Sequence, residues 1–168
     1  MKTLRPNKIQ LITFAFFALL YVLATMIGNR YMFVFNEQSE KSIPGVMWYV
    51  DMEDKDFDMG AIIAFTPPKL PDHFNSYQKG KSNFVKYVKG ESGDEIKIIG
   101  GNVYINDIKL TEISSHVVEK LKLKVSDITY TLDKDEIFVY GTHPRSYDSR
   151  YFGAIKLDKV IGESFELF

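Results

Sequence analysis

The sequence has 168 residues, 45% of them hydrophobic and 26% charged, a composition typical of one globular domain with an appendage. It contains no cysteine, which excludes a thiol nucleophile, a disulfide framework and a thiolate metal site. Four of the 21 basic residues lie in the first thirty positions, so residues 31–168 carry 17 basic and 22 acidic side chains; this acidic body lacks the basic face that nucleic-acid binding requires.

An apolar segment near the N-terminus predicts a membrane-spanning helix. Residues 11–27 contain no charged side chain, and as a helix they would reach about 26 Å. With its flanks, the segment 9–28 approaches the thickness of the hydrocarbon layer. Lys2, Arg5 and Lys8 precede it, and the positive-inside rule therefore places the N-terminus in the cytoplasm.

These features divide the chain into a cytoplasmic N-terminus (1–8), a transmembrane anchor (9–28) and an extracytoplasmic domain (29–168). The expected location is the cytoplasmic (inner) membrane, as a single-pass protein with the large domain outside, and the lipid bilayer is its first partner. A cleaved signal peptide is the alternative. Its apolar core would be shorter and would be followed by small residues at the cut, which the stretch Met26–Arg30 lacks.

The rest of the chain predicts a mainly β, antiparallel domain. Gly100-Gly101 and Asn106-Asp107 are two-residue hairpin signals, and only Ser114–Leu123 has a helical pattern. Pro67–Lys81 is predicted to be an exposed loop. Runs rich in Val, Ile, Tyr and Phe predict strands at Val46–Val50, Ala61–Phe65, Asn83–Val88, Glu95–Ile99, Asn102–Ile105, Asp127–Leu132, Glu136–Tyr140, Ala154–Leu157 and Ser164–Leu167.

Three segments carry residues that hydrolytic chemistry could use. The three histidines are far apart, so we expect no metal site and no cofactor, and a hydrolase would need an oxygen nucleophile and an unusual base. The segments are Lys41–Gly45, Phe84–Asp94 and Gly141–Gly153. Taken singly each is weak, because a serine before a proline is usually part of a turn and a lysine on a strand is usually at the surface.

Together, and in this order behind an apolar anchor, the segments resemble the signal peptidase I family. Ser42-Ile43-Pro44 is similar to the family's serine box, and Lys86, with Gly90, Gly93 and Asp94, is similar to its lysine box. The run from Ser146 to Gly153 is similar to its S-x-D-S-R-x-x-G box, and Gly60–Phe65 to the strand between the first two boxes. The short Ser-x-Pro spacing looks closer to the branch that matures pilins for conjugative transfer.

The resemblance implies a Ser/Lys dyad, with Ser42 as nucleophile and Lys86 as general base, supported by Ser146, Asp148 and Arg150. Ser146 corresponds to a serine that positions the lysine amine, and Asp148 and Arg150 to a structural ion pair. A lysine acts as a base only when neutral, and burial among apolar neighbours favours that form. Lys89 is the rival base, but on a strand it would face the opposite side from Lys86.

An oxyanion hole is also needed, and the backbone N–H of Ser42 is the natural donor. Many members add a hydroxyl or glycine two residues before the nucleophile. This chain has Glu40 there, which cannot donate while ionised, and Ser39 is one residue farther away.

The expected substrates are exported preproteins, or a pilin precursor, with small residues before the cut. Such peptides would bind as an added strand, with Ala61, Ile63, Phe84 and Val85 as candidate walls of the groove. We also hypothesise that Val46, Met47 and Trp48 dip toward the lipid.

Two other readings compete. One is a catalytically inactive, membrane-anchored β module with partners in a secretion or pilus assembly. The other is a self-cleaving repressor, but a membrane segment stands where such a protein carries its DNA-binding domain.

Overall fold

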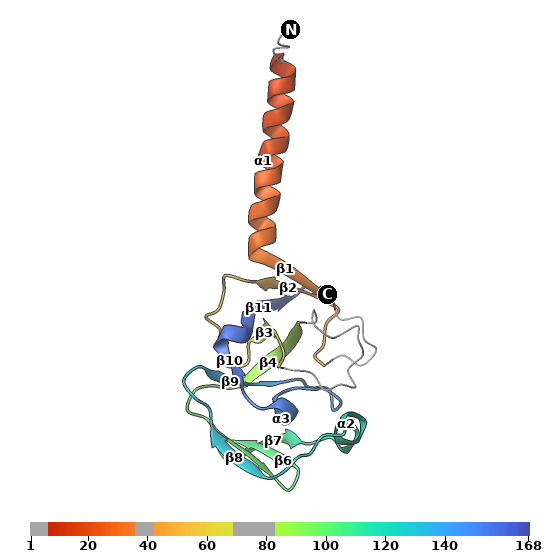
Figure 1. Cartoon of the computed structure of the whole chain (residues 1–168), viewed down its shortest axis with the longest axis vertical. Helices are drawn as coiled ribbons and strands as arrows, with labels where there is room; N and C mark the ends of the chain where they lie inside the picture. The colour runs from red at the N-terminus through yellow and green to blue at the C-terminus, as the bar shows by residue number, and fades with distance from the viewer. Residues whose placement is uncertain (1–6, 36–41, 69–82) are drawn as a thin grey trace.

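The computed structural model describes residues 7–35, 42–68 and 83–168. A single long helix projects from a β body that contains two sheets, and the C-terminus lies beside the base of the helix (Figure 1). Among the described residues the strand pairs are all antiparallel. The prediction of a mainly β domain behind one N-terminal helix is confirmed.

The projecting helix, α1 (Lys8–Arg30), is long and apolar enough to cross a membrane, and none of its residues is buried. It begins with a capping box, in which the Asn7 side chain accepts the Gln10 N–H at 2.8 Å and the Gln10 side chain accepts the Asn7 N–H at 2.9 Å. It runs two residues past the predicted segment and stops where alternating aromatic residues favour a strand.

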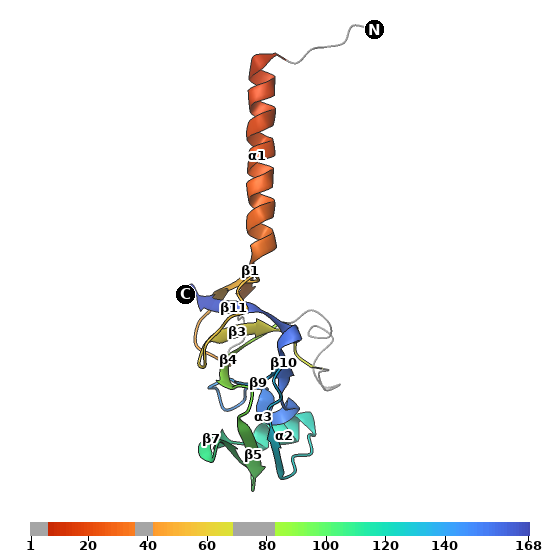
Figure 2. The same cartoon turned by 90° about the vertical axis from the view of Figure 1, so that its left-hand side faces the viewer.

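The larger sheet has seven strands in the order β1-β2-β11-β3-β4-β9-β10. Figure 2 shows its strands succeeding one another away from the base of α1, with β1 nearest to the helix. The strands are β1 (Tyr31–Phe35), β2 (Met47–Asp51), β3 (Ile62–Phe65), β4 (Phe84–Gly90), β9 (Glu136–Tyr140), β10 (Ile155–Lys156) and β11 (Val160–Glu166).

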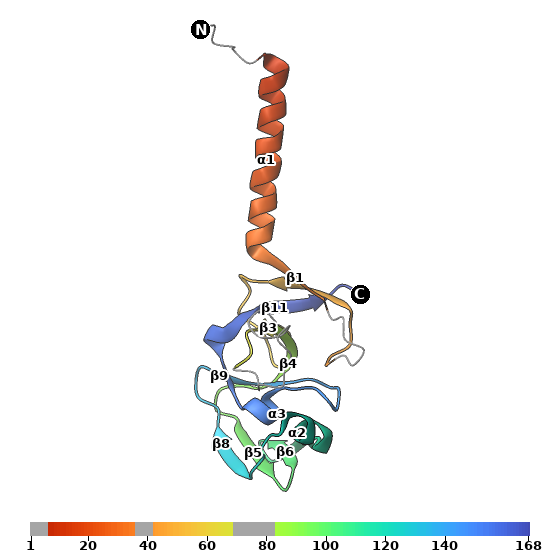
Figure 3. The ribbon, with the colours of Figure 1, turned by 45° about the vertical axis from the view of Figure 1, so that its right-hand side comes forward.

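The smaller sheet lies at the end of the body remote from α1, and Figure 3 shows it beside the two short helices. Its order is β7-β6-β5-β8, with β5 (Glu95–Ile99), β6 (Asn102–Ile105), β7 (Ile108–Glu112) and β8 (Ile128–Thr131). The helices are α2 (Ser115–Leu121) and α3 (Ser149–Phe152), and a single 3-10 turn, η1, covers Leu157–Lys159. Asn106 and Asp107 both have positive φ, which is typical of the two-residue hairpin turn that the sequence predicts.

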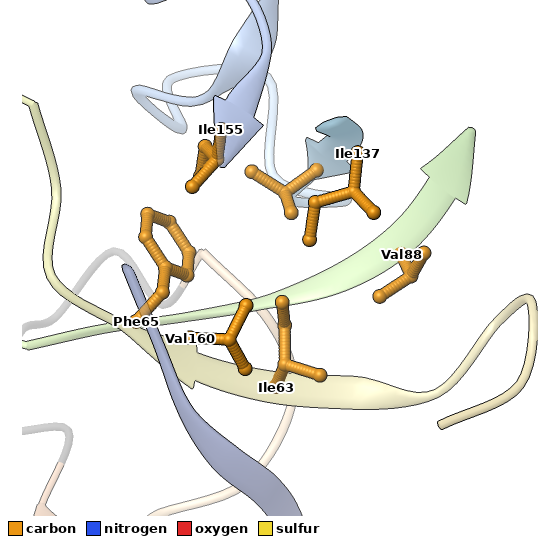
Figure 4. Close-up of a cluster of buried hydrophobic side chains, with 7 residues drawn as sticks. Ile63, Phe65, Val88, Ile137, Ile155 and Val160 are labelled. Carbon is orange, nitrogen blue, oxygen red and sulfur yellow. The ribbon is translucent and has the colours of Figure 1, made fainter. Parts of the chain in front are cut away.

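The core beneath the large sheet gathers side chains from five of its strands. Figure 4 shows Phe65 and its apolar neighbours from β3, β4, β9, β10 and β11 pointing toward one another. The side chains of residues 84, 86 and 88 point to the same face of β4. Val88 belongs to this cluster, and Phe84 packs against it. Lys86 therefore emerges on a face of the sheet that is lined by apolar side chains.

A second cluster corrects the hypothesis about lipid contact. Trp48 is only 2% exposed and packs with Ile43, Val50 and Val85, so it cannot reach the bilayer from this position. The alternation of β2 turns Trp48 inward, and sequence proximity to the anchor did not reveal which face would be buried. Val46, by contrast, is exposed.

Most of the predicted strands are present, with bounds that differ by one or two residues. The sequence reading missed β1 and β7, and β11 begins four residues before the predicted start. The alternating aromatic residues of β1 fit a strand that begins directly after the anchor helix. Most of the predicted loop Pro67–Lys81 lies outside the described residues.

Candidate active site

Lys86 is the one buried lysine in the described part of the body. It lies on β4, between β3 and β9, pairs with Ile63 and is only 4% exposed. Its Nζ donates to the carbonyl of Val85 at 3.2 Å and lies 5.2 Å from the centre of the Phe84 ring. Neither contact supplies a carboxylate to compensate the ammonium charge.

Burial lowers the pKa of Lys86 to about 8, against the action of Asp148, which raises it, while Arg150 lowers it further. Desolvation is the largest cause, because an ammonium loses more than a neutral amine when water is excluded. With this pKa, roughly a tenth of the molecules carry a neutral lysine at pH 7. Lys86 is therefore suited to accept a proton near neutral pH.

Lys89 faces the other side of the sheet, as the alternation of a strand predicts. Its Nζ lies 5.6 Å from the centre of the Tyr87 ring, and Tyr87 packs against the cluster that contains Trp48. Of the two lysines, only Lys86 is placed on the apolar face that carries Phe84 and Val88.

The loop after β9 contains a buried ion pair. Asp148 has no exposed surface and Arg150 is 3% exposed. The two side chains meet in a two-pronged contact, with Nε to Oδ1 at 2.7 Å and the NH2 group to Oδ2 at 2.7 Å. The pair that the sequence predicts is present, and its geometry is the strong bidentate form.

The same two side chains hold the loop in shape. Asp148 accepts the N–H of Gly141 at 2.9 Å, and Arg150 donates to the carbonyl of Ser146 at 3.1 Å. The Arg150 guanidinium also lies over the ring of Tyr140, 4.8 Å from its centre. These contacts tie residues 140, 141, 146, 148 and 150 together around the ion pair.

Ser146 lies in the same loop and has a buried side chain. It is 2% exposed, and its hydroxyl has no hydrogen-bond partner among the described residues. A buried hydroxyl without a partner costs free energy, so such groups are rare and call for an explanation. Its backbone is fixed, because the Ser146 N–H donates to the carbonyl of His143 at 2.9 Å.

Ser42 precedes β2 and lies against the same loop. Its carbonyl accepts the N–H of His143 at 3.3 Å. Gly141 lies between Ser42 and Ser146: a Cβ at this position would overlap the Ser146 hydroxyl and would lie 2.8 Å from the Ser42 carbonyl oxygen. The glycine thus allows the two serine segments to approach closely.

The loop after β9 therefore contacts Ser42 and is close enough to Lys86 to act on its charge. Ser42 and Ser146 both contact the stretch 141–143, while Asp148 and Arg150 act electrostatically on Lys86. Glu40 and Ser39, which bear on the second oxyanion donor, lie outside the described residues.

The four predicted groove residues do not share one environment. Ile63 has no exposed surface and belongs to the core cluster of Phe65, whereas Val85 packs on the other side with Trp48. Ala61 and Phe84 are partly exposed. The groove stays a prediction, and Ile63 lies beneath the surface in this structure.

Sequence reasoning assigned no role to three residues that shape the site. Gly141 provides the close approach, His143 donates to Ser42 through its backbone, and the Ser149 hydroxyl accepts the Val139 N–H at 2.9 Å. Gly141 opens the motif-bearing segment and Ser149 stands inside it, so their positions were a usable signal. No sequence pattern indicates the backbone contact of His143.

Comparison with known proteins gives a consistent result. The family model described as signal peptidase, peptidase S26, matches residues 7–168. A probable signal peptidase I-2 of Synechocystis sp. is 30% identical over 118 residues, which cover 68% of this chain and 49% of that protein. The thylakoidal processing peptidase 1 of Arabidopsis thaliana is 22% identical over 139 residues, covering 74% of this chain and 40% of that protein.

The chain thus spans about half the length of the curated relatives that it matches, or less. Among solved structures, a signal peptidase I of Enterococcus faecalis is 26% identical, covering 66% of this chain and 97% of that one, with a TM-score of 0.39. The match over residues 7–168, and not this superposition, establishes the family.

Proposed function

The chain belongs to the signal peptidase family, peptidase S26, and we propose that it is a membrane-bound serine endopeptidase that removes signal or leader peptides from exported preproteins. In this proposal Ser42 is the nucleophile and Lys86 the general base. The observation that carries it is the burial of Lys86, which lowers the pKa of its amine to about 8 beside the loop that contacts Ser42.

The proposed reaction uses Lys86 twice. Neutral Lys86 takes the proton of the Ser42 hydroxyl while the oxygen attacks the scissile carbonyl carbon. The C–N bond then breaks, the new amine leaves with that proton, and an acyl group stays on Ser42. A water molecule, deprotonated by Lys86 in turn, attacks the ester carbonyl carbon. The bond between the acyl carbon and the Ser42 oxygen then breaks, and Ser42 takes the proton back from Lys86. The Ser42 N–H is the proposed donor to the oxyanion.

Ser146 has the proposed role of holding the Lys86 amine in position. Its hydroxyl is buried and has no hydrogen-bond partner within residues 7–35, 42–68 and 83–168, and a hydroxyl can accept from an ammonium or donate to a neutral amine. The Asp148–Arg150 brace keeps this loop fixed, so the orientation of Ser146 does not depend on solvent.

The proposed location is the cytoplasmic membrane, with α1 as a single span and the β body outside. The basic residues before α1 support this orientation. Apolar side chains near the base of the helix support contact with lipid, since Phe33 is 55%, Phe35 62% and Phe168 77% exposed. A conjugative pilin precursor is the narrower substrate proposal, and secretion-system partners would then deliver it.

The test is cleavage in membranes by the wild type, Ser42→Ala and Lys86→Met, with a general preprotein and a prepilin each offered as substrate. Both variants should lose the mature product while their membrane levels stay unchanged. Lys89→Met is the matched control, because it removes a lysine three residues away on the opposite face, and it should cleave normally. Cleavage that survives in Ser42→Ala would overturn the proposal, and a wild type that cuts neither substrate would favour the inactive module.

A further inference from the structure

The anchor helix runs into the β body without a linker. α1 ends at Arg30, and Tyr31 is at once its C-cap, donating its N–H to the Ile27 carbonyl, and the first residue of β1. Tyr31 is already paired with Asp51 of β2. The direction of the helix is thus tied to the sheet at its first strand.

A bidentate ion pair closes this junction. Arg30 Nε lies 3.1 and 3.0 Å from the two oxygens of Asp51, and its NH2 group lies 2.6 Å from Oδ2. The Arg30 carbonyl accepts the Met52 N–H at 2.8 Å, so backbone and side chain of the last helical residue both hold β2. We call the contact between these two side chains the Arg30–Asp51 clamp.

Asp51 is fixed from its other sides. It is 7% exposed, its Oδ1 accepts the Glu53 N–H at 3.1 Å, and hydrogen bonding from Arg30 holds its pKa below the ordinary value. Gly162 of β11 lies so close that a Cβ there would overlap the Asp51 carbonyl. The clamp therefore joins the helix to a residue of β2 that is buried, hydrogen-bonded and closely packed.

An aromatic row extends the contact across three strands. The Arg30 guanidinium lies 5.2 Å from the centre of the Tyr31 ring, and Tyr31 meets Tyr49 edge-on at 6.2 Å between ring centres. Tyr49 stacks on Phe165 of β11 at 5.0 Å. Such pairs resist a change in the angle between helix and sheet.

Because of the strand order, the angle between α1 and the large sheet sets how far Lys86 lies from the end of α1 along the axis of the helix. From β1 the sheet continues through β2, β11 and β3 to β4, which carries Lys86, and Figures 1 and 2 show these strands receding from the base of α1. Four steps of about 4.8 Å separate β1 from β4, roughly 19 Å along the sheet. An extended peptide covers that distance with about six residues.

We infer that the Arg30–Asp51 clamp is a positioning device: it fixes the height of the Ser42–Lys86 site above the bilayer and so selects which bond of a membrane-inserted precursor is cut. The inference rests on the proposed function. It assigns to Arg30 and Asp51 a role in cut-site selection that needs no contact with the substrate.

The experiment uses the full chain in liposomes with two kinds of substrate. One is a set of membrane-inserted precursors in which identical small-residue cut sites stand two to ten residues beyond the apolar segment. The other is a short soluble peptide with the same cut site. Mass spectrometry gives the position of each cut, and initial rates give kcat and KM for the peptide.

The wild type should use a narrow range of spacings. The double variant Arg30→Gln/Asp51→Asn retains a neutral pair without a buried unpaired charge. This variant and the two single variants should each lose at least fivefold of the preference for these spacings. Their kcat/KM for the soluble peptide should stay within about twofold of wild type, and Arg30→Lys should restore the preference in part. Lys109→Gln, which breaks an exposed pair with Glu112, is the matched control.

An unchanged range of cut positions in the double variant would overturn the inference. Equal losses on both substrates would also overturn it, because the clamp would then act on folding or catalysis in general. A wild type that cuts neither substrate would instead refute the proposed function.

Discussion

The Asp148–Arg150 pair and Lys86 are buried close enough to act on each other's charge, yet their polar atoms are satisfied in opposite ways. The carboxylate and guanidinium bind each other and the surrounding backbone. Among the described residues the Lys86 amine has one backbone acceptor and no acidic hydrogen-bond partner, and the Ser146 hydroxyl has no hydrogen-bond partner. A paired charge stabilises the loop that carries it. A buried amine or hydroxyl without a partner lowers the stability of the fold and stays available for chemistry.

The largest expected effect on stability comes from breaking the pair. Asp148→Asn leaves the Arg150 guanidinium buried without its counter-charge and should lower the free energy of unfolding by about 3–5 kcal/mol. Urea unfolding in detergent measures the change. Glu112→Gln, which breaks the exposed pair with Lys109, should cause no measurable change, and equal effects of the two substitutions would contradict this contrast.

The opposite sign is expected at Lys86. The folded pKa of about 8 lies below the ordinary 10.5, so burying the ammonium destabilises the fold at pH 7, and Lys86→Met should raise the free energy of unfolding by roughly 3 kcal/mol. Between pH 8 and 10.5 the unfolded chain binds the extra proton, and the stability of the wild type therefore rises with pH. The gain of the variant should fade over this window in unfolding curves at several pH values, and a variant less stable than wild type at pH 7 would contradict the prediction.

The rate of cleavage should follow the neutral form of Lys86. Below pH 8 the rate is expected to rise about tenfold per pH unit, and above about 8 it should level off. Because the Asp148 carboxylate raises the pKa of Lys86, Asp148→Asn should move the midpoint to lower pH in whatever fraction stays folded. Initial rates on a soluble peptide between pH 5 and 10 measure both, and a profile without a rise below pH 8 would rule out Lys86 as the base.

The smallest effects on stability are expected at Ser146 and Ser149. The first hydroxyl has no hydrogen-bond partner among the described residues and the second has one, so the two substitutions compare an unpaired with a paired group. Ser146→Ala removes a hydroxyl that has no hydrogen-bond partner in the described part of the chain, so stability should change by less than about 1 kcal/mol while kcat falls roughly 10- to 100-fold. Ser149→Ala leaves the buried Val139 N–H without its acceptor and should cost about 1–3 kcal/mol with kcat nearly unchanged. Thermal melts and peptide kinetics on both variants separate the two roles, and matching profiles would refute the division.

The sequence by itself determined the anchor helix, most of the strands and the motif-bearing segments around Ser42, Lys86 and Ser146. These properties are local: a long uncharged run predicts a membrane span, and a period of two places Lys86 and Lys89 on opposite faces. The prediction for Trp48 was wrong because sequence proximity to the anchor cannot tell which face of β2 is covered.

The tertiary structure alone decided the contacts between distant segments. The approach of Ser42 and Ser146 across Gly141, the desolvation of Lys86 and the pairing of Arg30 with Asp51, 21 residues away, all depend on the order of strands in the large sheet. Local patterns state which face of a strand is apolar but not which strand lies beside it. Burial, and with it the pKa of Lys86, follows from that choice of neighbours.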